Sequence, residues 1–399
     1  MKSADAFSRN GFRVEVLGAW TIPILKARDE ELLGSLPFKF TSVADLTSGG
    51  LSRMRRRMRS KLGHMAQQFA NVENRWQLGY FYSELFKATF RRNADLYIAH
   101  SEQAMAVTVD LLRAGRRVGV DMEDWFSEDL LPNARRHRPL RWLRSLEREL
   151  LVGGAYASCP SRAMSTALAE EFGCRAPAVL YNAFGWELRQ LIDGLHKDRR
   201  DVRVPSIHWF SQTLGPGRGL EDLLAALPFV EHNVEVHLRG NQVDGIKGRM
   251  LNDLPEGIRN RIFFHDLVSN EELLSRIAEH DIGFAGEMTY CLSRDLTITN
   301  KILQYLVAGL AVVASDTAGQ REVAAQAPNA VLLYPSGDAV ALAARLNALL
   351  ASPDQMQRAR TAALEAAKQT FSWEHQEKVL LETVARALTK KVTYKQSSI

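Results

Sequence analysis

Polar side chains that could bind phosphate open a predicted helix near residue 300. Thr299 can cap this helix through its hydroxyl, and Asn300 and Lys301 fall in its first turn. The free N–H groups at a helix N-terminus favour anions, and Lys301 adds a full positive charge. Gly309 is typical of a left-handed helix end, and the apolar run Ala311–Ala314 predicts a buried strand. From these residues alone, a capped helix–strand unit without a ligand is the simpler interpretation.

A second group of reactive side chains follows predicted strands in the first half of the chain. These residues are His100, Glu123, Asp124, Ser161 and Asn182. Ligands of parallel sheets bind just beyond the carboxyl ends of the strands, so this position suits a binding or catalytic group. Each residue could instead cap the following helix, and capping is the preferred interpretation for Ser161.

The elements that must position these groups alternate between strand and helix along most of the chain. A polar, charged stretch at Trp186–Val204 separates two such series. The sequence therefore predicts an α/β protein with two Rossmann-like domains whose parallel sheets face each other across a cleft. The predicted segments are an acceptor-side domain at 1–185, a nucleotide-sugar-binding domain at 186–372, and a crossover helix with a polar tail at 373–399. The first series starts with the end of a helix and a strand at Phe12–Gly18, so a preceding strand is apparently missing.

Composition narrows the class of protein. A chain of 399 residues is too long for one ordinary core, and its 46% hydrophobic share is typical of a globular protein. Three widely separated cysteines lack metal-ligand spacing and predict a reducing compartment. The sequence lacks both a membrane-spanning apolar run and the apolar core of a secretory signal, so we expect a cytoplasmic protein.

The segment Leu51–Val72 is predicted to be a basic helix without acidic residues. Its basic residues are Arg53, Arg55, Arg56, Arg57, Arg59 and Lys61, and an apolar stripe follows Met54, Met58, Leu62 and Met65. Such a helix can lie on an anionic membrane surface, as a peripheral contact at the inner face of the cell membrane. A solvated face above a buried apolar stripe explains the pattern equally well. Because no nucleic-acid-binding motif accompanies the charge, nucleic acid is not an expected partner.

Four segments of the second series resemble the nucleotide-sugar glycosyltransferases of the GT-B fold, and specifically family 4. They are WFSQTLGPGRGLEDLLAAL (Trp209–Leu227), VEVHLRGN (Val234–Asn241), RIFFHDLVSNEELLSRIAEHDIGF (Arg261–Phe284) and NKILQYLVAGLAVVASDTAGQREV (Asn300–Val323). A fifth segment, FSWEHQ (Phe371–Gln376), is similar to the family's closing segment, whose helix crosses back to the first domain. The resemblance covers about half of the chain and extends to the first half only through the strand–helix rhythm.

The resemblance implies transfer of a sugar from a nucleotide donor, with retention of configuration, to a glycan or lipid-linked acceptor of surface polysaccharide synthesis. It implies no cofactor and no metal, because glycine-loop N–H groups, a helix N-terminus and cations can bind a diphosphate. The predicted catalytic residues are Arg218, Lys301 and Glu123. The predicted donor-binding residues are Thr213, Gly215, Gly217, Gly219, Arg239, His265, Leu267, Thr299, Asn300 and Gln304. His100 and Asp124 are predicted on the acceptor side.

The sequence departs from the family pattern at several positions. Leu296 and Gln304 stand where the family commonly has a pair of glutamates, and Thr213 replaces an arginine. Glu123 stands in place of a histidine and could act as a base or orient the sugar. These departures leave two alternatives open. One is a non-catalytic homologue that serves a partner enzyme, and the other is a sugar-nucleotide epimerase of similar fold.

Overall fold

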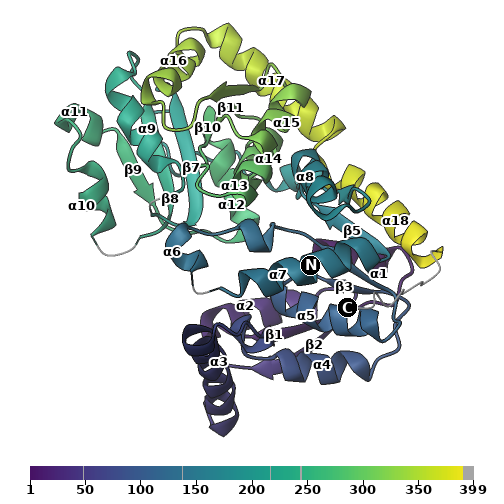
Figure 1. Cartoon of the computed structure of the whole chain (residues 1–399). Coiled ribbons are helices and arrows are strands. Elements are labelled where there is room, and N and C mark those ends of the chain that lie inside the picture. The colour runs from purple at the N-terminus through teal and green to yellow at the C-terminus, as the bar shows by residue number, and fades with distance from the viewer. Residues whose placement is uncertain (48, 137, 216, 243–244, 390–399) are drawn as a thin grey trace. The chain divides into compact units, whose positions relative to one another are not determined.

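The chain forms two compact units, shown in the computed structural model of Figure 1. The structure describes residues 1–47, 49–136, 138–215, 217–242 and 245–389, without the side chains at positions 24, 25, 28, 52 and 53. The first unit comprises residues 1–159, 165–180 and those from 377 onward, and the second comprises 160–164 and 181–376. The last helix, α18 (Trp373–Thr389), begins in the second unit and continues in the first. The predicted polar tail from Lys390 lies outside the described residues.

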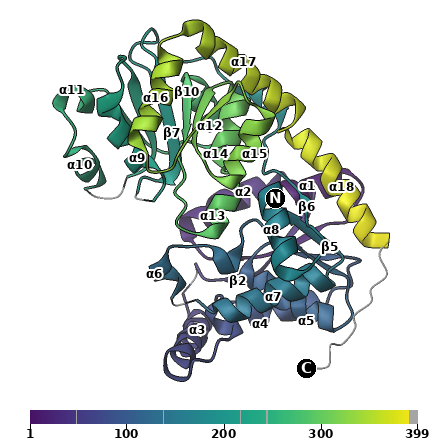
Figure 2. The same ribbon diagram turned by 45° about the horizontal axis from the view of Figure 1, so that its top comes forward.

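Within its described residues, the first unit has two parallel sheets. One pairs β1 (Glu15–Trp20) with β2 (Lys39–Asp45), and the other has the order β3-β4-β5-β6. The strands of the second sheet are β3 (Tyr97–Ala99), β4 (Val118–Asp121), β5 (Tyr156–Cys159) and β6 (Ala178–Val179). The α-helices are α1 (Lys2–Arg9), α2 (Pro23–Gly34), α3 (Leu51–Ala70), α4 (Tyr82–Phe90), α5 (Glu102–Arg113), α6 (Pro132–Arg135), α7 (Leu140–Gly153) and α8 (Arg162–Phe172), whose first three residues belong to the second unit. Short 3₁₀ turns are η1 (Arg75–Gln77) and η2 (Phe126–Glu128). Helices α5 and α7 pack beside each other on the four-stranded sheet (Figure 2).

The second unit is built on one parallel sheet with the order β12-β11-β10-β7-β8-β9. Its strands are β7 (Ser206–Thr213), β8 (Glu235–Asn241), β9 (Ile262–His265), β10 (Ile282–Ala285), β11 (Ala311–Ser315) and β12 (Val331–Tyr334). Its α-helices are α9 (Leu220–Ala226), α10 (Ile246–Leu251), α11 (Glu256–Arg259), α12 (Asn270–Ala278), α13 (Leu292–Leu296), α14 (Asn300–Ala308), α15 (Ala318–Gln326), α16 (Ala339–Leu350) and α17 (Pro353–Gln369). The 3₁₀ turns are η3 (Trp186–Leu191) and η4 (Leu227–Phe229). All five residues of β11 are buried, as expected for an apolar strand covered on both faces.

The two faces of this sheet carry different side chains. Trp209 of β7 belongs to the apolar core that includes Leu223 of α9 and Leu346 of α16. The preceding residue, His208, instead contacts the ring of Tyr305 on α14. Because successive side chains of a strand point to opposite faces, α9 and α16 cover one face and α14 covers the other.

The order of the strands reverses beside β7. From this central strand the chain continues outward through β8 and β9, and then returns to place β10 on the other side of β7. A crevice beyond the carboxyl ends of β7 and β10 is the position at which α/β sheets of this kind bind ligands. The loop after β10 approaches the loop after β7 at Gly219 and contacts the start of α14 at Lys301.

Local sequence predictions for α14 agree with the structure except at its cap. Thr299 occupies the N-cap position and Gly309 adopts the predicted left-handed conformation, with φ 83°. The prediction that the Thr299 hydroxyl caps the helix is wrong, because this side chain accepts no bond from a helix N–H. Ser161 does cap its helix, since its hydroxyl accepts from the Met164 N–H at 2.9 Å.

Two element boundaries also differ from prediction. The strand predicted at Phe12–Gly18 is β1, which begins at Glu15 and ends at Trp20. The strand–helix alternation of the sequence also predicts a helix at 244–254, whereas α10 is shorter and spans Ile246–Leu251. Position 244 lies outside the described residues. In the described part of the chain, no helix has both the length and the apolar character that a membrane span requires.

Candidate donor site

Two glycines bring the loop after β7 close to the loop after β10. Gly219 has φ 76°, and a Cβ atom at this position would lie 2.6 Å from the carbonyl carbon of Gly286. A side chain is therefore excluded both by the backbone conformation and by the close approach of the two loops. Gly217 also has φ 76°, and its N–H donates to the carboxylate of Glu221 at 2.7 Å. This N–H points to an oxygen anion, as a phosphate-binding glycine loop requires.

The remaining predicted residues of this loop are placed around the two glycines. Thr213 is the last residue of β7 and pairs with Asn241 of β8. A Cβ atom at Gly215 would meet no heavy atom of the described residues within 4 Å, so no close contact requires glycine there. Arg218 is exposed, and its guanidinium donates to the hydroxyl of Ser211 at 3.0 Å.

The side chains in the first turn of α14 are engaged in specific contacts. The amide oxygen of Asn300 accepts from the side-chain amide of Asn182 at 3.0 Å. The hydroxyl of Thr299 hydrogen-bonds the carboxylate of Glu287 instead of the helix. The N–H groups of this turn therefore lack a side-chain cap from Thr299 and can bind an anion. Gln304 lies one turn further along at intermediate exposure, whereas Leu296 is buried, with 7% exposure.

Lys301 forms a buried ion pair with Glu287, a residue in the loop directly after β10. Its ammonium lies 2.7 Å from the Glu287 carboxylate, and each side chain is 10% exposed. Burial raises the pKa of Glu287, but the nearby charge and hydrogen bond of Lys301 outweigh it and hold the pKa below its usual value. The charge of Arg294 and the Thr299 hydrogen bond act in the same direction. The pair therefore holds a charged ammonium group in a fixed position at the start of α14.

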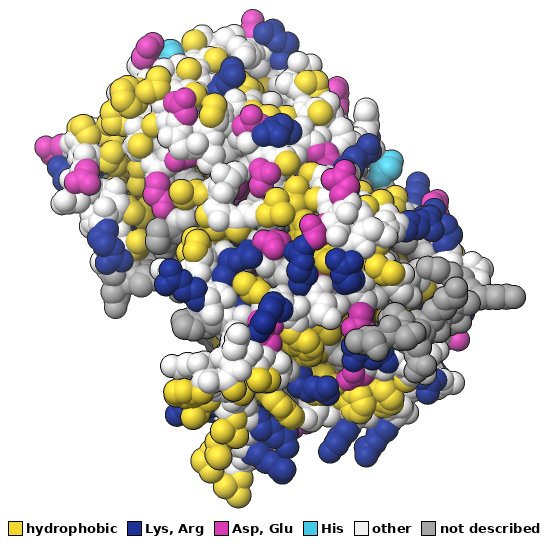
Figure 3. Space-filling model, viewed as in Figure 1, with side chains coloured by type: hydrophobic (Ala, Val, Ile, Leu, Met, Phe, Trp, Pro, Cys, Tyr) yellow, Lys and Arg dark blue, Asp and Glu magenta, His cyan; other side chains and the backbone are white. Residues whose placement is uncertain are grey.

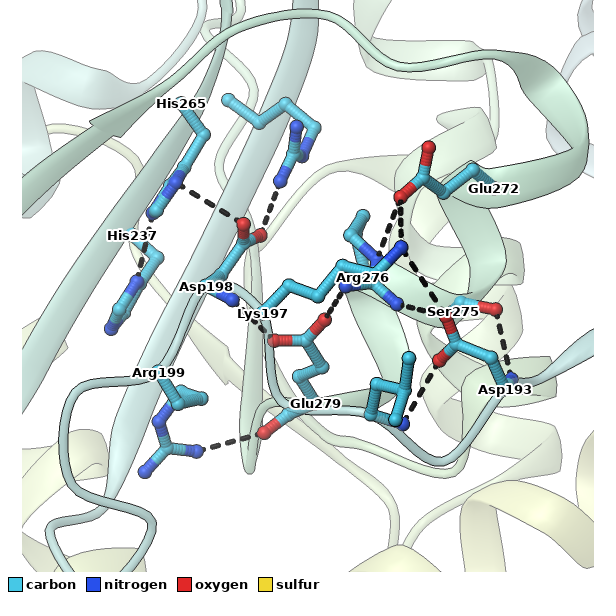
Figure 4. A network of polar contacts seen from close by, with 12 residues as sticks. Asp193, Lys197, Asp198, Arg199, His237, His265, Glu272, Ser275, Arg276 and Glu279 are labelled. Atoms are coloured by element: carbon cyan, nitrogen blue, oxygen red, sulfur yellow. Dashed lines mark hydrogen bonds and ion pairs between the residues drawn. The ribbon is translucent and has the colours of Figure 1, made fainter.

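His265, at the carboxyl end of β9, lies in a polar network with Asp198 (Figure 4). Arg239, near the carboxyl end of β8, forms an ion pair with the same aspartate. One ring nitrogen of His265 lies 2.9 Å from His237 and the other lies 3.3 Å from Asp198. Arg239 is buried and binds both Asp198 and the carbonyl oxygen of Asp266. These contacts hold the backbone of the loop after β9, which contains the predicted donor-binding residue Leu267.

Leu267 lies in that same loop and is 54% exposed. Its apolar side chain is available to a ligand, whereas the side chains of His265 and Arg239 are already used within the protein. His265, Arg239 and Leu267 thus lie near the same loop, but only the side chain of Leu267 is available to a ligand.

The predicted acceptor-side residues of the first unit gather at the ends of β3 and β4. His100 Nδ1 lies 3.2 Å from the carboxylate of Asp121 and 3.6 Å from that of Glu123. Desolvation lowers the pKa of His100, but the hydrogen bonds to both carboxylates outweigh it and raise the pKa to about 9. Asp121 is itself bonded to the hydroxyl of Ser158 at 2.8 Å. Asp124 follows in the turn before η2, at intermediate exposure.

These three side chains could also hold a metal ion. One ligand atom from each of His100, Asp121 and Glu123 lies within 4.8 Å of the other two, and nitrogen with carboxylate oxygens suits a divalent cation. The same geometry is that of a protonated imidazole between two carboxylates, which needs no metal.

The sequence analysis missed Glu287, Asp121 and Asp198. Glu287 and Asp121 stand at the carboxyl ends of β10 and β4, so the rule that selected Glu123 could have found both. Asp198 lies in the charged connection between the two series, where the sequence offers no signal for its contact with β8 and β9.

Comparison with solved structures places this geometry in a known fold. HepE of Anabaena, solved with UDP and glucose, is 18% identical, with a TM-score of 0.69 over 96% of this chain and 95% of that one. Sucrose-phosphate synthase of Thermosynechococcus elongatus is 14% identical, with a TM-score of 0.71 over 96% and 91%. A UDP-forming α,α-trehalose-phosphate synthase of Burkholderia xenovorans is 12% identical, with a TM-score of 0.66 over 96% and 100%. The chain has the GT-B fold of these glycosyltransferases.

The second unit also matches a sequence family. Residues 205–352, which include the glycine loop, Glu287 and all of α14, match the model for glycosyl transferases group 1. The sequence matches no curated protein. The solved structures confirm the predicted fold class, and the match of residues 205–352 to glycosyl transferases group 1 agrees with the predicted type of enzyme.

Proposed function

We propose that the chain transfers a sugar from a nucleotide-sugar donor to a glycan or lipid-linked acceptor in the synthesis of cell-surface polysaccharide. The observation that carries the proposal is the start of α14, where Lys301 and N–H groups without a Thr299 cap lie at the switch point of the sheet. HepE, a protein of the same fold, was solved with UDP-glucose, which supports a UDP-sugar as the first donor to test.

The main task of this site is to bind and stabilise the leaving diphosphate. As the bond between the sugar C1 and the phosphate oxygen breaks, negative charge grows on the diphosphate and positive character grows on C1. The N–H groups of α14, with the cations of Arg218 and Lys301, meet that negative charge without a metal. The resemblance to family 4 supports retention of configuration at C1.

The acceptor hydroxyl forms the new bond to C1, and its proton must pass to a base. Glu123 is the proposed proton acceptor on the first unit, and His100 lies 3.6 Å from its carboxylate. Asp121 holds His100 in place, since its carboxylate contacts the ring and accepts from the Ser158 hydroxyl. His100 in turn orients Glu123.

Donor use is tested with a panel of UDP-, GDP- and dTDP-sugars and mass detection of the product. We expect a glycosidic product from one donor, and unchanged turnover in the presence of a metal chelator. Arg218→Ala should weaken nucleotide-diphosphate binding at least tenfold, whereas Arg259→Ala, at another arginine of the same unit, should leave it unchanged. Release of a free epimer would identify an epimerase instead, and failure of every nucleotide to bind would refute the proposal. NMR of the product's anomeric carbon tests retention.

A further inference from the structure

Helix α3 of the first unit turns its apolar side toward solvent. The exposed fractions of its large apolar residues are Leu51 80%, Met54 56%, Met58 57%, Leu62 60%, Met65 42% and Phe69 77%. At 3.6 residues per turn these positions fall within an arc of about 80° and form one continuous stripe. In Figure 3, yellow side chains gather over α3 at the lower left of the molecule, with dark blue ones beside them. The alternative interpretation, a buried apolar stripe, is therefore wrong.

The opposite side of α3 packs on the protein through small and polar residues. Ser60 is buried, with 6% exposure, and a Cβ on Gly63 would lie 2.9 Å from the side chain of Trp76. Arg56 forms an ion pair with Glu84 at 3.1 Å, and Gln67 donates to the Arg138 carbonyl. The usual arrangement of an amphipathic helix is thus reversed. Small and polar residues at spacings of three and four seat the helix, while its methionines remain outside.

Basic residues flank the apolar stripe on both sides. On a helical projection Arg55 lies on one side of the stripe, and Arg57 and Lys61 lie on the other. All three are exposed and form no ion pair with another described residue. The side chain of Arg53 is not among those described, and Arg59 lies over the ring of Trp76, 5.3 Å from its centre. No acidic residue occurs between Leu51 and Val72.

A hollow at the start of the helix combines both kinds of group. It has a volume of about 390 Å³ and is lined by Gly49, Gly50, Met54, Arg57, Met58 and Lys61. Two cations beside two methionines are suited to a group that is anionic at one end and apolar at the other. A phospholipid at the edge of a bilayer has this chemistry.

We propose that α3 docks on an anionic lipid bilayer, with its apolar stripe inserted at the headgroup level and its basic flanks against lipid phosphates. A second copy of the chain is a poorer occupant, since two stripes face to face would bring their cationic flanks together. The proposal goes beyond the transfer reaction and places a lipid-linked acceptor within reach of the first unit.

Co-sedimentation with vesicles tests this proposal. The full chain is mixed with vesicles of phosphatidylcholine alone, or with one-third phosphatidylglycerol. We expect binding to the anionic vesicles, weaker binding at high salt, and little binding to the neutral ones. The triple variant Arg55→Gln, Arg57→Gln, Lys61→Gln should lower the partition coefficient on the order of 100-fold, from about fivefold for each positive charge removed.

Matched variants at exposed phenylalanines distinguish insertion of α3 into the bilayer from non-specific hydrophobic adsorption. Phe69→Ser should weaken vesicle binding about tenfold or more, whereas Phe229→Ser, at a phenylalanine of the second unit that is 52% exposed, should not change it. Equal losses in both variants, or equal binding to neutral vesicles, would overturn the proposal. So would dimerisation that Phe69→Ser abolishes while vesicle binding persists. Nucleotide binding in the same variants is expected to be unchanged, so failure here is distinguishable from failure of the proposed reaction.

Discussion

The buried pair of Lys301 and Glu287 gives the sharpest prediction. If one partner is removed, the remaining lysine can become neutral by losing a proton, whereas the remaining glutamate can become neutral by gaining one. Removing one member of a buried ion pair typically costs about 3–5 kcal/mol, since the other charge stays buried without compensation. Glu287→Gln leaves an ammonium group, and an unpaired lysine can lose its proton at pH 7 for about 5 kcal/mol. Lys301→Met leaves a carboxylate, and an unpaired carboxyl can gain a proton at pH 7 for about 4 kcal/mol. These two values are upper limits on the stability lost in Glu287→Gln and in Lys301→Met, respectively.

The two limits change with pH in opposite directions. Raising the pH makes the lysine cheaper to deprotonate, so the loss in Glu287→Gln should shrink by about 1.4 kcal/mol per pH unit near its limit. Lowering the pH makes the carboxyl cheaper to protonate, so the loss in Lys301→Met should shrink in the same proportion. The double variant removes both charges and should be less destabilised than the sum of the single variants.

Urea denaturation at pH 5.5, 7 and 8.5 measures these losses. Tryptophan fluorescence is a suitable signal, because the buried ring of Trp209 lies 5.8 Å from the Lys301 ammonium. For a unit of about this size, 3 kcal/mol also corresponds to a fall in Tm of roughly 6–12 °C. Losses that add in the double variant, or that show the same pH dependence in both single variants, would refute the ion-pair argument. The outcome does not depend on which donor is used.

Three further predictions concern other buried positions. Gly219→Ala should lower stability by about 1–3 kcal/mol and weaken nucleotide binding, because its Cβ would displace Gly286; thermal melts with and without UDP measure both effects. His208 is fully buried with neither ring nitrogen bonded to a described residue, and desolvation places its pKa well below the usual value. Its contribution to stability is therefore present above about pH 6.5 and lost as the pH falls, by about 2 kcal/mol at pH 5. His208→Leu should raise Tm at pH 5 relative to the wild type, whereas the exposed control His196→Leu should not. Burial raises the pKa of Glu147 to about 7, so its contribution is present below its ordinary pKa and lost as the pH rises through 7. The free energy of unfolding of Glu147→Gln, relative to that of the wild type, should therefore rise by about 3 kcal/mol between about pH 5 and pH 8, as measured by thermal melts.

The strand–helix order and the glycine loop could be predicted from the sequence because their signals are local. The strand–helix alternation of the sequence predicts helices at Arg162–Phe172 and Ala339–Leu350, and α8 and α16 have these bounds. Gly309 ends α14 as its residue type indicates. The partner of Lys301 could not be predicted in this way. Glu287 lies on a different element, and only the parallel pairing of β10 and β11 brings its loop to the start of α14. Contacts of this kind depend on the register of strands rather than on spacing along the chain.

The orientation of α3 could not be predicted for a different reason. A period of 3.6 residues identifies an apolar stripe, but the same period describes a stripe against a core and a stripe against solvent or lipid. The decisive signal lies on the opposite side of the helix, at Ser60, Gly63 and Gln67. Small and polar residues at helical spacing can seat a helix closely on the protein, and they then leave the apolar side uncovered.

The charge balance at the start of α14 also explains why two cations serve the proposed site. A diphosphate placed beside Glu287 alone would meet a carboxylate whose pKa is held low, and the like charges would repel each other. Lys301 cancels that carboxylate at 2.7 Å, so the pair adds little net attraction for a distant anion. The guanidinium of Arg218 is bonded to the neutral hydroxyl of Ser211 and keeps its full charge for a ligand. In the proposed mechanism we therefore expect the initial capture of the donor to depend mainly on Arg218 and the N–H groups of α14. Lys301 is expected to act at close range, where its ammonium can be shared between Glu287 and a phosphate oxygen.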